Sequence, residues 1–334
     1  MTIDLTVVWA LLIAFGIAAY VVMDGFDLGI GILFPLFRIG GERDQAMNAV
    51  APVWDGNETW LVLGGGGLLA AFPLAYAIIL PALYAPLIAM LLGLVFRGVA
   101  FEFRWRDSGH RKVWDSGFFV GSLVASLAQG VTLGALLQGI SVSGRAYAGG
   151  WWDWLTPFSL LTGASLVAGY ALLGAAWLVW KTEGALQDDA RRFARRLAPA
   201  LVVAIGLVSL ATPFLDQSYY RRWFEAPGLF VAVPMPLLVV GAAWALWRSL
   251  ARGGGDGRPF LWALSLFMLT LAGLAVSIWP DVIPGRVSIW QAAAPARSQS
   301  FMLVGALILI PMILAYTAWS YWVFRGKVGD EGYH

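Results

Sequence analysis

Four acidic side chains lie in two short motifs inside apolar stretches of this 334-residue sequence. Asp24 and Asp27 are three residues apart in one motif, and Asp55 and Glu58 are three residues apart in the other. Residues three apart lie on the same face of a helix, so each pair would bring two carboxyl groups together. Two close carboxyl groups in a low-dielectric setting raise one another's proton affinity. The chemistry that these residues indicate is therefore proton binding and transfer.

The composition of the chain indicates that these acids belong to a membrane protein. Hydrophobic residues make up 60% of the sequence, charged residues 13%, and the mean hydropathy is +0.74, far from the values of a soluble domain. Long unbroken apolar runs favour helices, because barrel strands alternate apolar and polar residues over about 10 residues. We expect an all-α integral membrane protein, a single polytopic domain over residues 1–334 with about nine transmembrane helices. The expected spans are 7–34, 53–73, 76–98, 115–139, 156–180, 197–215, 228–247, 259–279 and 300–324.

The Lys and Arg residues between the spans predict the orientation, because cytoplasmic loops carry an excess of them. With the N-terminus outside, the inner side holds Arg38, Arg43, Arg104, Arg106, Arg111, Lys112, Lys181, Arg191, Arg192, Arg195, Arg196, Arg248, Arg252, Arg258, Arg325 and Lys327. The outer side holds only Arg145, Arg221, Arg222, Arg286 and Arg297. We therefore expect the N-terminus outside and the C-terminus in the cytoplasm. Met1-Thr-Ile-Asp4 carries no basic residue, so the first span is expected to remain in the mature protein.

The residue types that are missing exclude several kinds of site. Without Cys, the chain has no disulfide, iron–sulfur cluster or thiolate nucleophile. Its two His residues are His110, in a charged loop, and His334, the last residue, so we expect neither a haem nor a metal ion bound by this chain alone. It also lacks a phosphate-binding Gly loop, a nucleophile–His–Asp set and a basic stripe for nucleic acid. The glycines at 64–67, like Gly25 and Gly29, are expected to allow close helix packing.

The acids are expected to gather at the inner side of the membrane. With a rise of 1.5 Å per residue, the first pair lies toward the inner end of the first span and the second pair near the inner start of the second. Arg97 and Glu102 follow where the third span leaves the membrane. A charge inside a membrane costs at least about 2.5 kcal/mol, so such groups usually face a bundle interior, a partner or water. Two interpretations stay open: a solvated or ion-paired rim, in which Arg97 neutralises an acid, and a proton entrance.

Several stretches of the chain resemble subunit II of the cytochrome bd-type quinol oxidases, including the cyanide-insensitive branch. They follow the family order over nearly the whole chain, and the Trp-Asp-Gly-Asn and Gly-Phe-Asp-x-Gly motifs together are highly specific. The matching stretches are Asp24-Gly-Phe-Asp-Leu-Gly-Ile-Gly31, Ala51-Pro-Val-Trp-Asp-Gly-Asn-Glu-Thr-Trp60, Phe96-Arg-Gly-Val-Ala-Phe-Glu-Phe-Arg104, Leu137-Gln-Gly139 and Ile310-Pro-Met-Ile-Leu-Ala-Tyr-Thr-Ala-Trp-Ser-Tyr-Trp322. The chain departs from the family pattern in its short outer loops before the seventh and ninth spans.

The resemblance implies a haem-free subunit of a terminal quinol:dioxygen oxidoreductase in the respiratory chain of a bacterial cytoplasmic membrane. It implies two four-helix bundles plus one peripheral helix, and a partner subunit I that carries two b-type haems and one d-type haem. The complex oxidises quinol and reduces dioxygen to water with cytoplasmic protons, without pumping. Subunit II stabilises subunit I, contributes a proton-uptake path and has no activity alone. A structural quinone or lipid in this chain and a small single-helix accessory subunit stay open.

The motifs also carry residue roles from the family to this sequence. Asp55 of Trp-Asp-Gly-Asn matches the family's acid in the inter-subunit proton path, Asp27 matches the acid of Gly-Phe-Asp-x-Gly, and Asp24 precedes it in the same pattern. Arg97 belongs to the Phe-Arg motif, which lies near Asp55 in that fold. The resemblance thus implies a proton path through three acids. Supporting polar positions are Glu58, Asn57, Arg97, Glu102 and Trp54.

Two other classes of protein remain as alternatives. A proton-coupled secondary transporter would also need membrane carboxylates, but it should show internal repeats or helices broken near the midplane. The sequence shows no convincing internal repeat, and its acids cluster toward one leaflet. A pure scaffold would use its acids only to pair with the partner subunit. Substitutions that abolish assembly without ever changing turnover would favour the scaffold.

Overall fold

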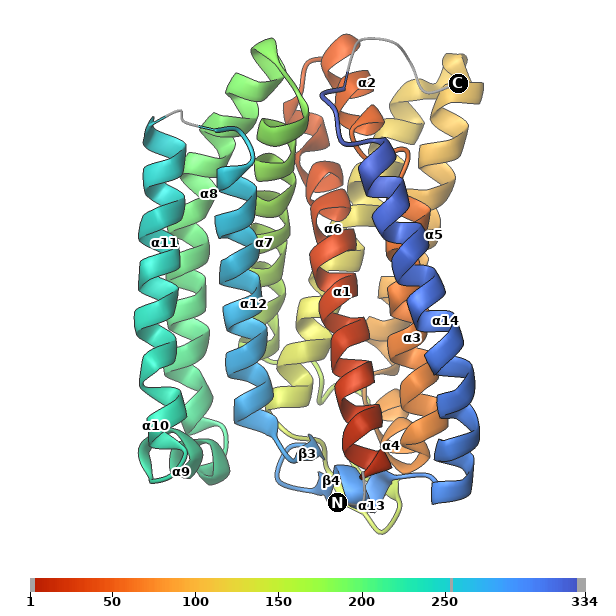
Figure 1. Ribbon diagram of the computed structural model, residues 1–334, viewed down its shortest axis with the longest axis vertical. Helices are drawn as coiled ribbons and strands as arrows, with labels where there is room; N and C mark the ends of the chain where they lie inside the picture. Colours follow the sequence, from red (N-terminus) through yellow and green to blue (C-terminus); the bar gives the residue numbers. More distant parts are fainter. Residues whose placement is uncertain (1–3, 253–254, 329–334) are drawn as a thin grey trace.

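The computed structural model describes residues 4–252 and 255–328, and helices dominate it (Figure 1). In these residues eight helices are long and apolar enough to cross a membrane, and the bent pair α3 and α4 adds a ninth crossing if it is counted as one span. The predicted all-α membrane fold is confirmed. The longer helices are α1 (Leu5–Leu33), α3 (Trp54–Ala71), α4 (Pro73–Ala82), α5 (Tyr84–Arg106), α6 (Arg111–Leu137), α7 (Pro157–Lys181), α8 (Gly184–Ala211), α11 (Pro234–Arg252), α12 (Arg258–Ile278) and α14 (Ala296–Val323).

Short elements close the two ends of the molecule. The short helices are α2 (Gly41–Asn48), α9 (Gln217–Phe224), α10 (Leu229–Ala232) and α13 (Ile289–Ala292), with 3-10 turns η1 (Phe34–Leu36), η2 (Ser108–His110) and η3 (Thr212–Phe214). The strands β1 (Val142–Ser143) and β2 (Ala146–Tyr147) pair antiparallel, as do β3 (Asp281–Ile283) and β4 (Val287–Ser288). The β3–β4 hairpin lies at the end where α1 begins, and α2 lies at the opposite end, where α1 ends (Figure 1).

Nine of these ten longer helices, all except α4, form two groups of four with one helix outside them (Figure 1). One group consists of α1, α3, α5 and α6, and the other of α7, α8, α11 and α12. Helix α7 packs against both α1 and α6 and so joins the groups. Helix α14 lies at the edge against α1 and α3, with most of its surface exposed. This arrangement agrees with the expected two four-helix bundles plus one peripheral helix.

Helices α4 and α8 lie differently from the spans expected there. The expected spans 53–73 and 76–98 correspond to α3, α4 and α5, and α4 bends by 119° from α3. Pro73 opens α4, because the first helical turn tolerates its missing N–H and fixed φ. Helix α8 begins at Gly184, well before the expected start at 197. Its first turns are amphipathic and charged, and they precede the apolar run from which the span was predicted.

Glycines bring neighbouring helices into backbone contact around the charged residues. A Cβ atom on Gly29 of α1 would collide with the backbone of Tyr170 in α7, and one on Gly174 would collide with Gly29 in return. Gly93 of α5 and Gly121 of α6 exclude each other's Cβ atoms in the same way. Small residues allow such close packing between membrane helices. These contacts hold α1, α5, α6 and α7 at fixed distances, and α1 and α5 carry most of the acid cluster described below.

The glycine run in α3 also faces α1. Cβ atoms on Gly64 and Gly67 would meet Ile17 and Ile13 of α1 at 3.3 and 2.9 Å, whereas the two glycines between them face open space. The run therefore sets the distance between α1 and α3, as expected for a packing motif.

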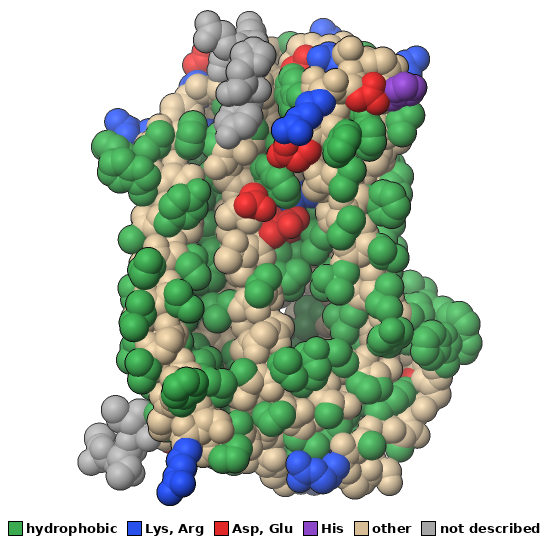
Figure 2. Space-filling view, turned by 90° about the vertical axis from the view of Figure 1, so that its right-hand side faces the viewer, with side chains coloured by type: hydrophobic (Ala, Val, Ile, Leu, Met, Phe, Trp, Pro, Cys, Tyr) green, Lys and Arg blue, Asp and Glu red, His purple; other side chains and the backbone are tan. Residues whose placement is uncertain are grey.

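The face in Figure 2 is covered mainly by hydrophobic side chains, and acidic side chains interrupt it in its upper half. Lys and Arg side chains gather toward the two ends of the molecule. Exposed apolar residues on α3, α5 and α14 include Val62, Val95 and Leu307. An apolar surface of this extent is typical of contact with lipid or with another membrane subunit.

Two lysines fix the residues that follow α14 at the end of the described chain. Lys181 Nζ lies 2.5 Å from the carbonyl oxygen of Phe324 and 2.7 Å from that of Gly326. Lys327 Nζ in turn donates to the carbonyl oxygen of Thr182 at 3.0 Å and to Asp256 at 2.7 Å. This reciprocal contact, which we call the lysine clasp, attaches the end of α14 to α7 and to the loop before α12.

Candidate functional site

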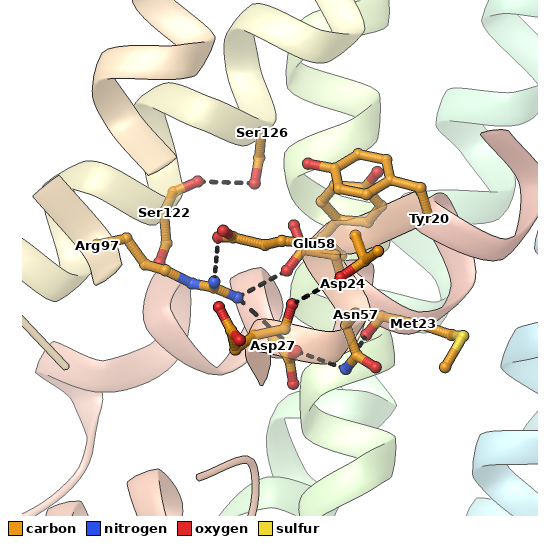
Figure 3. A network of polar contacts seen from close by, with 12 residues as sticks. Tyr20, Met23, Asp24, Asp27, Asn57, Glu58, Arg97, Ser122 and Ser126 are labelled. Carbon is orange, nitrogen blue, oxygen red and sulfur yellow. Dashed lines mark hydrogen bonds and ion pairs between the residues drawn. The ribbon is translucent and has the colours of Figure 1, made fainter. Parts of the chain in front are cut away.

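Arg97 of α5 lies at the centre of a buried acidic cluster (Figure 3). Its side chain is only 1% exposed, and its terminal nitrogens reach acids on two other helices. Nη2 lies 2.7 Å from Asp24 Oδ1 and 3.7 Å from Asp27 Oδ2, both on α1. Nη1 donates a hydrogen bond to Glu58 of α3. We call these four residues the Arg97 cluster, in which one guanidinium group faces three carboxyl groups.

The Arg97 cluster has more acid than base. With every group ionised it would hold one positive and three negative charges, an arrangement that a membrane interior penalises. Arginine stays protonated in proteins, so only the acids can reduce this excess by binding a proton. Asp27 keeps one buried oxygen, Oδ1, without a hydrogen-bond partner among the described residues. The geometry therefore suits a site that binds and releases protons.

A tyrosine and an amide orient Asp27. Asn57 Nδ2 donates to Asp27 Oδ2 at 2.7 Å and to the carbonyl oxygen of Met23 at 3.3 Å. The hydroxyl of Tyr321, on α14, donates to the Oδ1 atom of the same amide at 2.9 Å. Residues of α1, α3 and α14 thus meet at one carboxyl group, and Asn57 lies between the peripheral helix and the Arg97 cluster.

A second tyrosine and amide connection reaches Asp24. Gln129 Nε2 of α6 donates to the hydroxyl of Tyr20 at 2.6 Å, and the Tyr170 hydroxyl donates to Gln129 Oε1 at 2.9 Å. Tyr20 in turn interacts with Asp24, one turn further along α1. The polar groups that surround the Arg97 cluster therefore come from both four-helix groups.

Three of the residues expected to take part lie at the edge of the cluster or outside it. The Trp54 ring lies 5.4 Å from the guanidinium carbon of Arg97, a cation–π contact. Asp55 is exposed on α3, although we expected it among apolar neighbours. Glu102 is exposed as well and lies 3.8 Å from Arg106 on its own helix. The structure thus brings Asp24, Asp27, Asn57, Glu58 and Arg97 together, with Trp54 beside them, and leaves Asp55 and Glu102 at the surface.

A second buried ionic group lies two turns further along α5. Arg104 Nε is 2.5 Å from Asp115 Oδ1, and Arg104 Nη1 is 2.7 Å from Asp44 Oδ1. Arg43 Nη1 lies 2.6 Å from Asp115 Oδ2, and Arg111 Nη1 lies 3.8 Å from Asp44 Oδ2. We call these five residues the Arg104 cluster. Three guanidinium groups face two carboxyl groups here, the reverse of the balance around Arg97.

The sequence reasoning did not include several of these groups. Tyr20 could have been found, because it precedes Asp24 by four residues and so shares its helix face. Asp115 could also have been suspected, since it opens an apolar run. Tyr321 gave no local signal, because it is 264 residues from its partner Asn57 and only the fold brings them together.

The described residues offer little to a haem or a metal ion. His110 lies exposed in η2, where its Nδ1 atom is 3.0 Å from Asp107, and His334 is outside the described residues. The hydrogen bond from His110 lowers the pKa of Asp107. Within residues 4–252 and 255–328, no group of three or more acidic or His side chains is arranged to hold a metal ion. An exposed histidine of this kind does not suit an axial haem ligand in a membrane interior.

The fold and the site together define a class: a polytopic helical membrane protein with ionisable groups held between its helices. The comparisons with known proteins name the family within that class. The chain belongs to the family described as cytochrome bd terminal oxidase subunit II, whose family model matches residues 5–324. The family predicted from the motifs is confirmed, and the chain is a subunit of a quinol oxidase.

Relatives match this chain over nearly its full length. Cytochrome bd-I ubiquinol oxidase subunit 2 of Escherichia coli (strain K12) is 31% identical, with 97% of this chain and 95% of the relative covered. Cytochrome bd ubiquinol oxidase subunit 2 of Bacillus subtilis (strain 168) is 29% identical, with 97% and 96% covered. A solved bd oxidase structure from Geobacillus thermodenitrificans matches with a TM-score of 0.75 at 16% identity, covering 94% of this chain and 98% of that one. This last similarity shows a shared fold.

Proposed function

We propose that this chain is the haem-free subunit of a terminal quinol:dioxygen oxidoreductase and that it supplies a proton-uptake path for the reduction of dioxygen to water. The observation that carries the proposal is the Arg97 cluster, with its excess of buried acid, one turn from the exposed acid Asp55. Carboxyl groups inside membrane proteins commonly relay protons. Asp55 would receive the proton, and the Arg97 cluster, to which Asp27 and Asp24 belong, would be the site that the proton reaches next.

The haems belong to the partner subunit in this proposal. Two b-type haems and one d-type haem would be held by subunit I, where quinol is oxidised and dioxygen reduced, without proton pumping. This chain would stabilise subunit I through apolar side chains such as those on α3, α5 and α14, and alone it would have no activity. A structural quinone or lipid, and a small single-helix accessory subunit, fit the same apolar surface.

We further propose that the N-terminus faces outward and the C-terminus faces the cytoplasm. Support comes from the basic residues at the end that carries α2, the Arg104 cluster and the lysine clasp. Basic residues favour the cytoplasmic side. In this orientation Asp55 and Glu58, in the first turns of α3, lie on the side from which protons are taken.

Secondary transport is the weaker alternative, and the position of the bend between α3 and α4 counts against it. A transporter would need a helix broken near the midplane at its binding site. Helix α3 alone, with 18 residues, spans roughly 27 Å, so the break at Phe72 lies near the far membrane edge from Asp55. No specific observation favours transport.

The substitution Asp55→Asn tests the proposed function. In the purified oxidase complex it should slow quinol oxidation while the haem absorbance spectrum stays close to that of the wild type. Asp27→Asn, which acts inside the cluster, should do the same. Full turnover in both variants would remove these acids from the path. Loss of the complex without a change in turnover per haem would indicate a scaffold.

A further inference from the structure

One acid of the Arg97 cluster differs from the other two in its access to the surface. The side chain of Glu58 is 26% exposed, whereas those of Asp24 and Asp27 are 0% and 1% exposed. Glu58 follows Asp55 by one helical turn on α3, so their side chains share a helix face. A proton that arrives at Asp55 therefore meets Glu58 before it meets either aspartate.

The hydrogen bonds around Asp27 keep one of its oxygens in the role of an acceptor. The Asn57 amide nitrogen faces two acceptors, the Met23 carbonyl oxygen and Asp27 Oδ2, and only an NH₂ group can satisfy both. Tyr321 donates to the oxygen of the same amide, which fixes that orientation. The remaining oxygen, Asp27 Oδ1, has no hydrogen-bond partner within the part of the chain that the structure describes. A proton there would form a buried hydroxyl without an acceptor, at a cost of about 1–3 kcal/mol.

Asp24 is likewise surrounded by donors. Its Oδ1 atom accepts from Arg97 Nη2 at 2.7 Å. Tyr20 accepts a hydrogen bond from Gln129, so the proton of its own hydroxyl is free to point toward Asp24. Gln129 presents its NH₂ group to Tyr20 because Tyr170 occupies its oxygen. Both groups that contact the Asp24 carboxyl group, Arg97 and Tyr20, donate hydrogen bonds to it. Hydrogen bonds of this kind favour the carboxylate form of Asp24 over its acid form.

Glu58 has neither of these restraints. One of its oxygens accepts from Arg97 Nη1, and its partial exposure lets a hydroxyl on the other oxygen find water. The charged groups that face it are Arg97 from α5, Asp24 and Asp27 from α1, and Asp55 from its own helix. One proton on Glu58 reduces the excess negative charge of the cluster from two units to one.

We propose that Glu58 is the proton-carrying acid of the Arg97 cluster, and that Asp24 and Asp27 stay ionised as the partners of Arg97. Glu58 takes a proton from water or from the Asp55 carboxyl group and releases it again as a proton, and no electron is transferred. Asn57, Tyr321, Tyr20 and Gln129 are positioning residues in this account. The assignment rests on the proposed function, since it names the group that carries the proton along that path.

Infrared spectroscopy of the purified oxidase complex over a pH series tests the assignment. A protonated carboxyl group gives a C=O stretching band that shifts when the buffer is changed to D₂O. We expect such a band to titrate in the wild type, to be absent in Glu58→Gln, and to be unchanged in Glu183→Gln. Glu183 is a matched control because it is an exposed glutamate just before α8, far along the chain from the cluster. Glu58→Asp, which keeps the carboxyl group, should keep a band with a shifted midpoint.

The variant Asp27→Asn gives the second readout. It removes one negative charge near Glu58, so the titration midpoint of the Glu58 band should move to lower pH while the band persists. A band that persists unchanged in Glu58→Gln and vanishes in Asp27→Asn would assign the proton to Asp27 and overturn the proposal. A wild type without any titrating band would overturn it too.

Measurements of turnover distinguish a failure of the Glu58 assignment from a failure of the proposed proton path. Glu58→Gln should lower oxygen consumption per haem by roughly tenfold or more, with partial recovery in Glu58→Asp. If Glu58→Gln turns over at the wild-type rate while Asp55→Asn and Asp27→Asn are slow, the proton path stands and the role of Glu58 fails. If all of these variants turn over normally, the proton path itself fails.

Discussion

The two buried arginines of α5 lie in clusters of opposite charge balance. Arg97 faces three carboxyl groups, whereas Arg104, two turns later and equally buried, shares two aspartates with two further arginines. The Arg104 cluster has one more basic group than acidic groups, so each of its acids has a cation beside it. The Arg97 cluster needs a bound proton to approach neutrality. The ratio of acid to base, rather than burial alone, therefore separates a structural ion-pair network from a site fit for proton transfer.

The largest effect on stability is expected from Arg97→Gln. It leaves three acids without the one cation that pairs with them among the described residues, and removal of one partner of a buried ion pair costs about 3–5 kcal/mol. The assembled complex should lose yield and melt at a markedly lower temperature, followed by thermal loss of the haem absorbance. Arg106→Gln is the matched control, because Arg106 is exposed on the same helix. A melting temperature equal to that of the control would refute the central role of Arg97.

A smaller loss of stability is expected from Arg104→Gln. Asp115 keeps Arg43 and Asp44 keeps Arg111, so each acid retains a cation. The cost should be about 1.5–3 kcal/mol, the range for hydrogen bonds to charged groups. The same melting experiment measures it, and turnover per haem should stay at the wild-type level. A loss as large as that of Arg97→Gln would erase the difference between the two clusters.

The positioning role of Tyr321 predicts a weaker effect again. Tyr321→Phe removes one hydrogen bond to Asn57 and should cost about 0.5–1.5 kcal/mol. Because the amide then loses its fixed orientation, oxygen consumption per haem should also fall several-fold. Tyr316→Phe, at an exposed position of the same helix, should change neither quantity. Equal turnover in the two variants would mean that the hydrogen bond from Tyr321 is not required to orient the Asn57 amide.

The smallest effect is expected at the lysine clasp, which lies outside both clusters. The hydrogen bond from Lys327 lowers the pKa of Asp256. The pair therefore stabilises the folded protein at pH values above the usual aspartate pKa of about 3.9. This stabilisation is lost as the pH falls through the lower pKa that Asp256 has in the folded protein. Both groups are partly exposed, so the contribution is about 1 kcal/mol or less. Asp256→Asn should lower the melting temperature slightly at pH 7 and by less at an acidic pH below the usual aspartate pKa. A constant difference at both pH values would contradict this.

The long apolar runs predicted the helical membrane fold, and the resemblance to the family, not the runs, implied the two four-helix bundles. Helix α4 was not expected as a separate element, since its apolar residues continue into the next span. Only Leu83 separates α4 from α5, and the sharp bend lies at Phe72, between α3 and α4. The polar motifs predicted that Asp24, Asp27 and Arg97 belong to one region.

The contacts within that region could not be predicted in the same way. The exposure of Asp55, the central place of Glu58 and the approach of Tyr321 depend on the rotation of α3 and the position of α14. Periodicity within a single helix does not determine either one. The Arg104 cluster was missed for a related reason, because basic residues near a membrane edge are already explained by topology.

Turnover per haem in Asp27→Asn compared with Asp115→Asn tests the central claim most directly. Each variant neutralises one buried aspartate that contacts an arginine of α5. We predict that Asp27→Asn, which changes the charge around the proton-carrying Glu58, lowers quinol-driven oxygen consumption per haem by roughly tenfold, whereas Asp115→Asn lowers thermal stability and leaves turnover per haem unchanged. Wild-type turnover in Asp27→Asn, or an equal loss in both variants, would contradict the account.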